Sequence, residues 1–230
     1  MRSSFFGNLI GQKAVAAHRK QQYDDALKLY REAEAKGMNN FVMLKNYAAL
    51  LIRKGFFDEA LPVLERCDRA PGLQSAERTD LLVNYAIILW KKGHLEHAVE
   101  VLQKQLENHR TGNLYSVLGY LLIEQGNAEK TLSFCEEALD YDETDPIFLD
   151  NIGQVYMRLL KDPRKAKPYF EKAIEQKPDA IDSNYLLALI ETEEGKKDQA
   201  RKRLEIAKKG NFTPLNYATP ERIEEALRSL

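Results

Sequence analysis

Apolar residues along the chain fall at helical spacing, in two runs per unit of 33 to 38 residues. The segment RKGFFDEALPVLER begins at Arg53, and the similar segment KKGHLEHAVEVLQK begins at Lys91. Each has a basic pair, a glycine, a short turn and then a run with one apolar side. Spacings of three and four residues predict amphipathic helices, and the alternating runs that predict strands are absent from the sequence. The pattern therefore predicts an all-α protein.

An alanine after the turn marks the units. It recurs at spacings of 34, 38, 33, 35 and 34 residues, with threonine in the fourth unit: Ala26, Ala60, Ala98, Thr131, Ala166 and Ala200. A glycine stands five residues earlier in four units: Gly55, Gly93, Gly126 and Gly195. Six units in one register predict a stack of helical hairpins.

Turn and cap residues indicate where these helices begin and end. Gly126 follows a first helix as a C-cap glycine does. Asp162 and Pro163 suit the N-cap and the first position of a second helix. Pro62 and Pro168 fall at equivalent places in two second helices. Because proline removes a backbone hydrogen bond, we expect a late helix start or a local bend at both.

The last twelve residues, TPERIEEALRSL, predict one further helix, with Thr219 as N-cap and Pro220 at its first position. A helix with one polar side suits the open end of a repeat stack. We therefore expect an N-terminal extension (1–6), six repeats (7–40, 41–74, 79–111, 112–145, 146–180 and 181–214), an extended loop (75–78) and a capping helix (215–230).

The repeats resemble the tetratricopeptide repeat family over about residues 7–214. The family's first-helix pattern is met twice, by Tyr115, Leu118, Gly119 and Leu122 and by Leu149, Ile152, Gly153 and Tyr156. Its second-helix pattern is met by Ala166, Phe170, Ala173 and Pro178. The resemblance implies a right-handed α-solenoid of about six hairpins whose first helices line a concave groove. It also implies a non-catalytic protein–protein interaction module, an adaptor or scaffold with a protein or peptide ligand.

The family's groove-facing positions, carried onto this chain, give an expected peptide-binding groove. Its residues are Lys45, Ile52, Arg53, Asn84, Ile87, Trp90, Lys91, Tyr120, Ile123, Gln154, Met157 and Arg158. The apolar members either form an exposed stripe for a peptide or an amphipathic helix, or pack between neighbouring first helices. The basic members either flank a ligand or form a solvated edge.

Two finer features of the groove follow from the same resemblance. Asn46, Asn84 and Asn151 share one repeat position, where the amide either reaches a ligand backbone or bonds within the repeats. The carboxylate clamp of chaperone-binding members is not expected. Its cationic half is missing, since Asn113 and Val117 stand at the last pair of clamp positions.

Composition gives little support for nucleic-acid binding, for a membrane span or for an enzyme. The 34 basic and 35 acidic residues leave a net charge of −1, and the acidic groove positions Asp80, Glu124, Asp150 and Asp182 oppose an RNA reader. Residues 1–115 carry 17 basic and 13 acidic side chains, and residues 116–230 carry 17 and 22, so the groove is expected to be more basic toward the N-terminal half. No apolar run reaches the roughly 20 residues of a membrane span.

The candidate catalytic and metal-binding residues have simpler explanations. His94 and His97 flank a turn without a matching set of ligands, and Cys67 and Cys135 suit buried structural thiols. We therefore expect no enzyme activity, no metal and no cofactor. Two cysteines without a disulfide framework favour the cytoplasm. A signal peptide at the N-terminus is disfavoured, because its alanines are packing positions of the first repeat.

Self-association is the alternative function. An exposed N-terminal edge with Phe5 and Phe6, or the convex side of the stack, would make the chain a structural or assembly subunit. We expect a monomer or a weak homo-oligomer.

Overall fold

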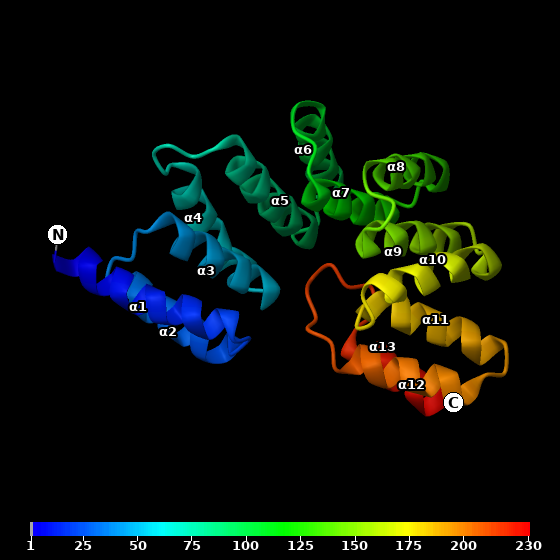
Figure 1. Ribbon diagram of the computed structural model, residues 1–230. Helices are drawn as coiled ribbons and strands as arrows, with labels where there is room; N and C mark the ends of the chain where they lie inside the picture. The colour runs from blue at the N-terminus through cyan, green and yellow to red at the C-terminus, as the bar shows by residue number, and fades with distance from the viewer. Residues whose placement is uncertain (1) are drawn as a thin grey trace. The chain divides into compact units, whose positions relative to one another are not determined.

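A computed structural model describes residues 2–230, with side chains from residue 4 onward. Over this range the chain forms thirteen α-helices and one π-helical segment, without a strand, which confirms the all-α prediction (Figure 1). The elements are α1 (Arg2–Arg19), α2 (Tyr23–Ala35), α3 (Phe41–Arg53), α4 (Phe57–Asp68), α5 (Ser75–Lys91), α6 (Leu95–Asn108), α7 (Gly112–Gln125), α8 (Ala128–Tyr141), α9 (Pro146–Gln154), η1 (Val155–Leu159), α10 (Pro163–Gln176), α11 (Ile181–Glu193), α12 (Lys197–Lys208) and α13 (Pro220–Ser229).

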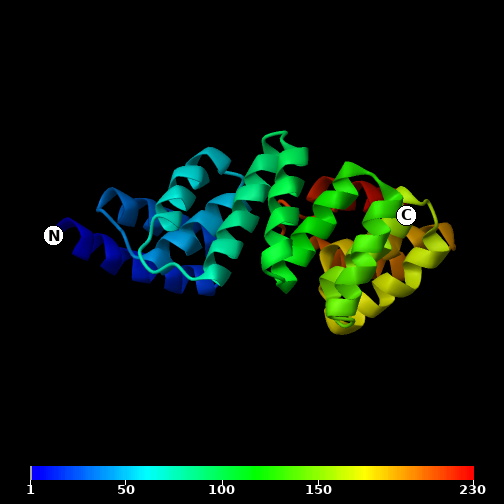
Figure 2. The same ribbon diagram turned by 90° about the horizontal axis from the view of Figure 1, so that it is seen from above.

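The helices belong to two compact units, which meet in sequence between Val101 and Leu102. Unit 1 holds α1 to α5 and the start of α6, and unit 2 holds the remainder. Within each unit consecutive helices pack as hairpins, as α1 with α2 and α9 with α10 do in both views (Figures 1 and 2). Each unit is thus a short all-α solenoid of helical hairpins.

The recurring glycines occupy the turns inside the hairpins. Gly55, Gly93, Gly126 and Gly195 all have φ between 78° and 89°, the left-handed region that glycine enters without strain. In the two repeats without this glycine, Gln21 and Lys161 stand at the same position and take φ of 59° and 56°. The turn conformation is therefore kept even where its preferred residue is missing.

Polar residues cap the helices that follow turns. The Asp162 carboxylate accepts a bond from the Lys165 N–H (3.0 Å), and the Thr219 hydroxyl accepts one from the Arg222 N–H (3.3 Å). Pro163 and Pro220 occupy the first turn of these helices. Both predicted helix starts are confirmed.

Two expectations about boundaries are wrong. Residues 75–78 form the first turn of α5, because the Glu77 side chain accepts from the Gln74 N–H in a capping box (3.0 Å). The lengthened connection lies before them, at residues 69–74. The described part of the expected extension, residues 2–6, belongs to α1. There Gly7 lets the helix approach the α2 turn so closely that a Cβ would lie 2.5 Å from the Met38 nitrogen.

Pro62 and Pro168 do not delay their helices, which begin five residues earlier at Phe57 and Pro163. Each proline frees one carbonyl four residues before it, on Asp58 and Arg164. Both of these residues are exposed, so water replaces the missing donor.

The π-helical segment has a visible origin in the sequence. Repeat five has one residue more than repeat four between its Leu-Gly position and its marker alanine. The wider turns of Val155–Leu159 take up this residue, as π-bulges do. Arg158 lies inside this π-helical segment, so the direction of the Arg158 side chain depends on the wider turns.

Close helix packing explains the glycines of the Leu-Gly pattern. A Cβ on Gly153 would lie 2.6 Å from the Phe170 ring, and one on Gly119 would lie 2.8 Å from the Asn151 amide. Phe170 is fully buried. A larger residue would push α9 from α10 at Gly153, and α7 from α9 at Gly119.

Candidate functional site

The first helices of successive repeats pack against one another within each unit. We call the side that they form the first-helix face. In unit 2 it is formed by α7, by α9 with η1, and by α11. In unit 1 it is formed by α1, α3 and α5. The twelve expected groove residues all lie on first helices, counting Met157 and Arg158 on η1.

Three carboxylates and one arginine gather on the first-helix face of unit 2. Arg158 forms an ion pair with Glu124 (2.6 Å) and donates to the Gln154 amide oxygen (2.8 Å). The Gln154 amide in turn donates to Asp150 (2.6 Å), and the Ser183 hydroxyl also donates to this carboxylate. These contacts join three repeats through one chain of polar side chains.

The two aspartates of this cluster are buried next to each other. Burial, together with the charge of Asp182, raises the pKa of Asp150 to about 7. Burial also raises the pKa of Asp182, but three N–H donors oppose that rise. The donors around Asp182 favour its ionised form, whereas burial and the charge of Asp182 favour the neutral form of Asp150.

Residues 211–218, which we call the return segment, lie against this cluster. They follow α12 and precede α13. The Asp182 carboxylate accepts bonds from the backbone N–H groups of Tyr217 (3.1 Å) and Ala218 (2.8 Å) and from the Asn216 side-chain amide (3.3 Å). One carboxylate of the first-helix face therefore holds three consecutive residues of the chain by charge-assisted hydrogen bonds.

The Tyr217 ring is held by two arginines. The Arg158 guanidinium lies 4.0 Å from the ring centroid and the Arg222 guanidinium lies 4.2 Å from it. Tyr185 of α11 contacts the same ring, with 6.4 Å between centroids. Cation–π and aromatic contacts of this kind anchor aromatic side chains at peptide-binding surfaces.

The first-helix face of unit 1 carries different chemistry at the same repeat positions. Lys45 and Asp80 stand where unit 2 has Asp150 and Asp182, and they form an ion pair (2.6 Å) with side chains 33% and 39% exposed. The Arg53 guanidinium lies over the Tyr23 ring at 5.0 Å.

The rest of this face is partly exposed. The Lys91 ammonium lies 3.6 Å from the centroid of the Trp90 ring. Trp90 and Asn84 are half-buried, and Lys91 is exposed. This face therefore offers an aromatic ring and an amide to solvent.

The apolar residues expected in the groove do not form an exposed stripe on the first-helix faces. Ile52, Ile87, Tyr120 and Ile123 are between 1% and 6% exposed, and Gln154 is fully buried. Met157 is half-buried against the core of unit 2. Neighbouring first helices approach closely enough to bury these side chains, which is the alternative that the sequence left open. In the same way, the Asn151 amide is buried and donates to the Ser116 carbonyl of the preceding repeat (3.0 Å).

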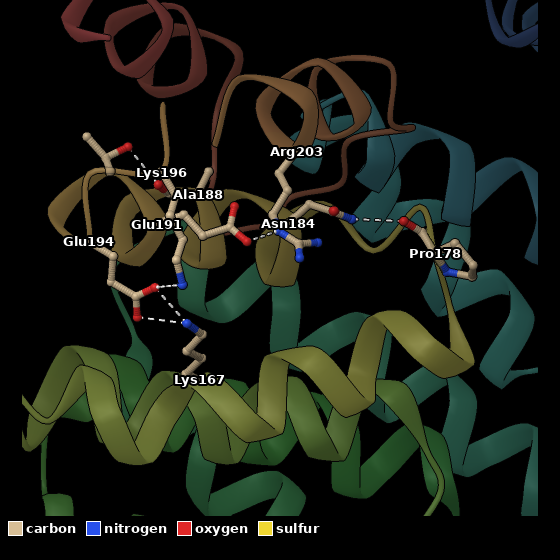
Figure 3. A network of polar contacts seen from close by, with 9 residues as sticks. Lys167, Pro178, Asn184, Ala188, Glu191, Glu194, Lys196 and Arg203 are labelled. Carbon is tan, nitrogen blue, oxygen red and sulfur yellow. Dashed lines mark hydrogen bonds and ion pairs between the residues drawn. The ribbon is translucent and has the colours of Figure 1, made fainter. Parts of the chain in front are cut away.

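Ion pairs on the other side of α11 fix the helices that carry the unit 2 face (Figure 3). Glu194 accepts from Lys167 of α10 (2.7 Å) and from Lys196 (2.6 Å). These two cations lower the pKa of Glu194 to about 2. Arg203 of α12 donates to the buried Glu191 (2.7 Å). The contacts join α10, α11 and α12.

The cysteine and histidine candidates lie in surroundings typical of structural residues. Burial raises the pKa of Cys67 to about 11 and that of Cys135 to about 12, so both free thiols are unreactive near neutral pH, as expected of structural cysteines. His97 lies 3.7 Å from Glu100. Between residues 2 and 230 no three histidine, cysteine or acidic side chains are placed to hold a metal ion. In the same range no helix has the length and apolar character of a membrane span.

Sequence reasoning did not identify Asn216, Tyr217, Ala218 and Arg222 as part of a site. Their contacts depend on a segment that folds back over two earlier repeats, and helical periodicity carries no information about it. The available signal was the length of the eleven-residue stretch KGNFTPLNYAT (209–219), which lies between α12 and α13.

Known proteins resemble this chain in sequence pattern and in fold. Tetratricopeptide repeat profiles match residues 79–108 and residues 157–214. A comparison with curated protein sequences finds no match. Among solved structures, a tetratricopeptide repeat protein from Parabacteroides merdae is 17% identical with a TM-score of 0.73, and the match covers 96% of this chain and 83% of that one.

Two further solved structures show the same fold. A thermophilic tetratricopeptide repeat protein of Thermus thermophilus is 21% identical with a TM-score of 0.59, and the match covers 77% of this chain and 94% of that one. The human IFIT1 dimer with m7Gppp-AAAA is 16% identical with a TM-score of 0.65, over 91% of this chain and 51% of that one. This chain thus spans about half the length of IFIT1.

Tetratricopeptide repeats are generally non-catalytic modules for protein–protein interaction. The hairpin turns, the Leu-Gly packing and the matching profiles agree over several repeats. The chain contains tetratricopeptide repeats.

Proposed function

We propose that this protein is a non-catalytic cytoplasmic adaptor that binds a peptide segment of a partner protein on the first-helix faces of its repeats. One observation carries the proposal. The face of unit 2 holds a non-helical segment of its own chain through the Asp182 carboxylate and the Arg158 guanidinium. Backbone N–H donors and an aromatic anchor are the groups by which an extended peptide is recognised. The same groups on a partner would be recognised in the same way.

The face of unit 1 is the proposed site for the partner. Asn84 and Trp90 are half-buried there and lie six residues apart on α5, so both residues are partly accessible to solvent. Aromatic side chains in such positions are frequent hot spots of binding. Arg53 and Lys91 add positive charge nearby, which favours a peptide with acidic residues.

Charge argues against nucleic acid as the ligand of unit 2. Glu124, Asp150 and Asp182 lie together on its face, with Arg158 as the cation among them. A phosphate backbone would be repelled by this arrangement. The acidic cluster favours a ligand that brings N–H donors.

A peptide selection tests the proposal. Peptides would be selected on the immobilised protein from a phage-displayed random library, and their affinities measured by fluorescence anisotropy. We expect Asn84→Ala/Trp90→Ala to weaken the selected peptides by at least about tenfold, the loss of roughly 1.4 kcal/mol typical of a hot spot.

The matched control is Glu96→Ala/Glu100→Ala on exposed positions of α6. It should leave the affinity unchanged, and circular dichroism would establish that both variants keep their helices. Equal binding by all three proteins would show that the peptide does not use the unit 1 face, and the proposal would then be wrong.

Self-association remains a second candidate, because α1 exposes apolar side chains. Phe5, Phe6 and Leu9 are 67%, 56% and 45% exposed. Two adjacent exposed phenylalanines are unusual for a monomer surface. Light scattering of wild type and Phe5→Ser/Phe6→Ser would decide: a concentration-dependent mass that the substitutions abolish supports association through this edge, and a constant monomer mass excludes it.

A further inference from the structure

The connection between α12 and α13 is longer than its position requires. The Lys197 ammonium at the start of α12 donates to the Leu230 carbonyl after α13 (2.9 Å), and Lys208 at the end of α12 pairs with Glu224 in the first half of α13 (2.6 Å). The two helices are therefore antiparallel, with neighbouring ends joined by residues 209–219. Antiparallel helices need only two to eight connecting residues, and the turns at 20–22, 54–56 and 194–196 use three.

The additional length is used to reach the first-helix face. Directly after α12, Gly210 passes so close to the start of α11 that a Cβ would lie 2.3 Å from Ile181. A turn follows in which the Asn216 N–H donates to the Thr213 carbonyl (3.1 Å), while the Asn216 side-chain oxygen accepts from the Thr213 N–H (2.8 Å). This turn aims Asn216 and the two residues after it, Tyr217 and Ala218, at Asp182.

We propose that the return segment is an internal ligand that closes a peptide-binding surface on unit 2, and that a partner peptide with an asparagine, an aromatic and a small residue in succession displaces it. The inference rests on the proposed function in that both treat first-helix faces as peptide-binding surfaces. It adds that the first-helix face of unit 2 is closed by residues 211–218, and that a peptide with an asparagine, an aromatic and a small residue in succession opens it.

Helix α13 is anchored by contacts outside the return segment. The return segment can therefore leave the first-helix face without unfolding of α13. Ile223 is fully buried in the core of unit 2, and Lys208–Glu224 holds α13 from a second side. Most of the return segment is only half-buried; Ala218 is its buried residue. The segment is held by the hydrogen bonds to Asp182, by the stacked Tyr217 ring, by the Arg222 bond to the Tyr217 carbonyl (2.6 Å) and by packing of Phe212, Tyr217 and Ala218 on the core. A competing peptide with the same residues supplies the same donors, carbonyl and apolar side chains.

The recognised chemistry follows from the three residues that make contact. Asp182 accepts hydrogen bonds from two successive backbone N–H groups, those of the aromatic and the small residue of the ligand. Because proline has no N–H group, it is excluded at both positions. Ala218 is 1% exposed, which excludes a large side chain at the third position. The aromatic residue must fit between Arg158 and Arg222, and the asparagine supplies the third donor to Asp182.

The test supplies the return segment in trans. In one variant of the full chain, Gly-Ser-Gly-Ser replaces residues 211–218 and keeps Thr219 and Pro220 as the start of α13. A labelled synthetic peptide, GNFTPLNYAT, is titrated into this variant and into wild type and followed by fluorescence anisotropy. We expect measurable binding to the variant and at least about tenfold weaker binding to wild type, whose face is occupied.

Matched controls assign the binding to the face. Adding Asp182→Asn to the variant should weaken the peptide by about tenfold or more, because the charged acceptor is lost. Asp80→Asn, at the equivalent repeat position of unit 1, should not. A peptide with alanine at the positions of Asn216 and Tyr217 should not bind.

A second variant and a wild-type measurement keep the proposal testable if the loop replacement does not fold. Asn216→Gly/Tyr217→Gly keeps the loop length and should also bind the peptide. In wild type, the Tyr217 and Ala218 amides should exchange hydrogen faster than the buried amides of α11, since the segment opens locally.

Failure of this inference is distinguishable from failure of the proposed function. A folded loop variant that does not bind the peptide, or Tyr217 and Ala218 amides that exchange only by global unfolding, would show the return segment to be a fixed linker. Library peptides would still bind unit 1 in that case. Loss of library binding at unit 1 with retained binding of GNFTPLNYAT would instead contradict only the proposed function.

Discussion

At the scale of single residues, the turn position before each second helix keeps a left-handed backbone conformation even where glycine is replaced by another residue. Four hairpins place glycine there, and Gln21 and Lys161 take the same left-handed conformation. A residue with a Cβ is strained in this region by roughly 1–2 kcal/mol. The fold holds both residues there because the packing of each hairpin requires the turn.

Lys161→Gly is therefore expected to stabilise unit 2. Removing the strain is partly offset by the greater freedom of glycine in the unfolded chain, so the gain should be up to about 1 kcal/mol. Urea unfolding measures it. The reverse change, Gly195→Ala at φ 78°, should destabilise by a similar amount. A Lys161→Gly variant less stable than wild type would mean that the lysine side chain contributes more than the strain.

The buried aspartates give a second prediction at this scale, on pH. Asp150 binds its proton more tightly when folded, with a pKa of about 7 against 3.8, so its contribution to stability falls as pH rises from about 4 to about 7. The charged groups around it are Asp182 and Arg158; Gln154 and Ser183 are neutral donors. Asp150→Asn should flatten this part of the stability curve and stabilise the protein at pH 8 by about 1 kcal/mol or more.

Urea unfolding at several pH values measures the slope. Ser183→Ala is the matched comparison, because it removes a hydrogen bond that favours the ionised Asp150. It should steepen the fall in stability between pH 4 and 8. An unchanged slope in Asp150→Asn would show that the proton is not held at this carboxylate.

At the scale of elements, one additional residue in repeat five changes the type of helix. The π-helical segment Val155–Leu159 places Arg158 where it reaches Glu124 and Tyr217 together. A regular α-helix would turn the side chain by a different angle. The additional residue of repeat five thus produces the Arg158–Tyr217 contact that holds the return segment.

Deletion of the exposed Leu160 is expected to convert η1 to a regular α-helix. The variant should lose the Arg158 contacts and about 1.5–3 kcal/mol of stability, the value of a hydrogen bond to a charged group. Faster hydrogen exchange at Tyr217 and Ala218 would identify the cause. Deleting Gly72 in the α4–α5 connection is the control, and it should leave these two amides unaffected.

At the scale of the whole molecule, each unit contains one buried thiol. Cys67 lies in unit 1 and Cys135 in unit 2, and both are at most 1% exposed. In a solenoid, stability is a sum of local contributions, so a change in one unit should mainly open that unit. The thiols therefore report on the two units separately.

Ile223→Ala in the capping helix should destabilise unit 2 by about 2–5 kcal/mol. Labelling of Cys135 by a disulfide reagent should accelerate at least about tenfold, whereas Cys67 should change little. Leu51→Ala, a buried residue of α3, should give the opposite result. Equal acceleration of both thiols in both variants would mean that the two units unfold as one.

The sequence by itself determined the helical hairpins of this protein. Helix periodicity, the glycines of the turns, and caps such as Asp162 and Thr219 act over a few residues, so their effect is visible in the local sequence. Only the tertiary structure decided which first-helix side chains reach solvent, as the burial of Ile52 and Tyr120 shows. It also brought Tyr217 to Asp182, a contact between residues 35 apart that no local pattern specifies. Such contacts depend on how close neighbouring helices come and where a long connection folds, and both are set by packing.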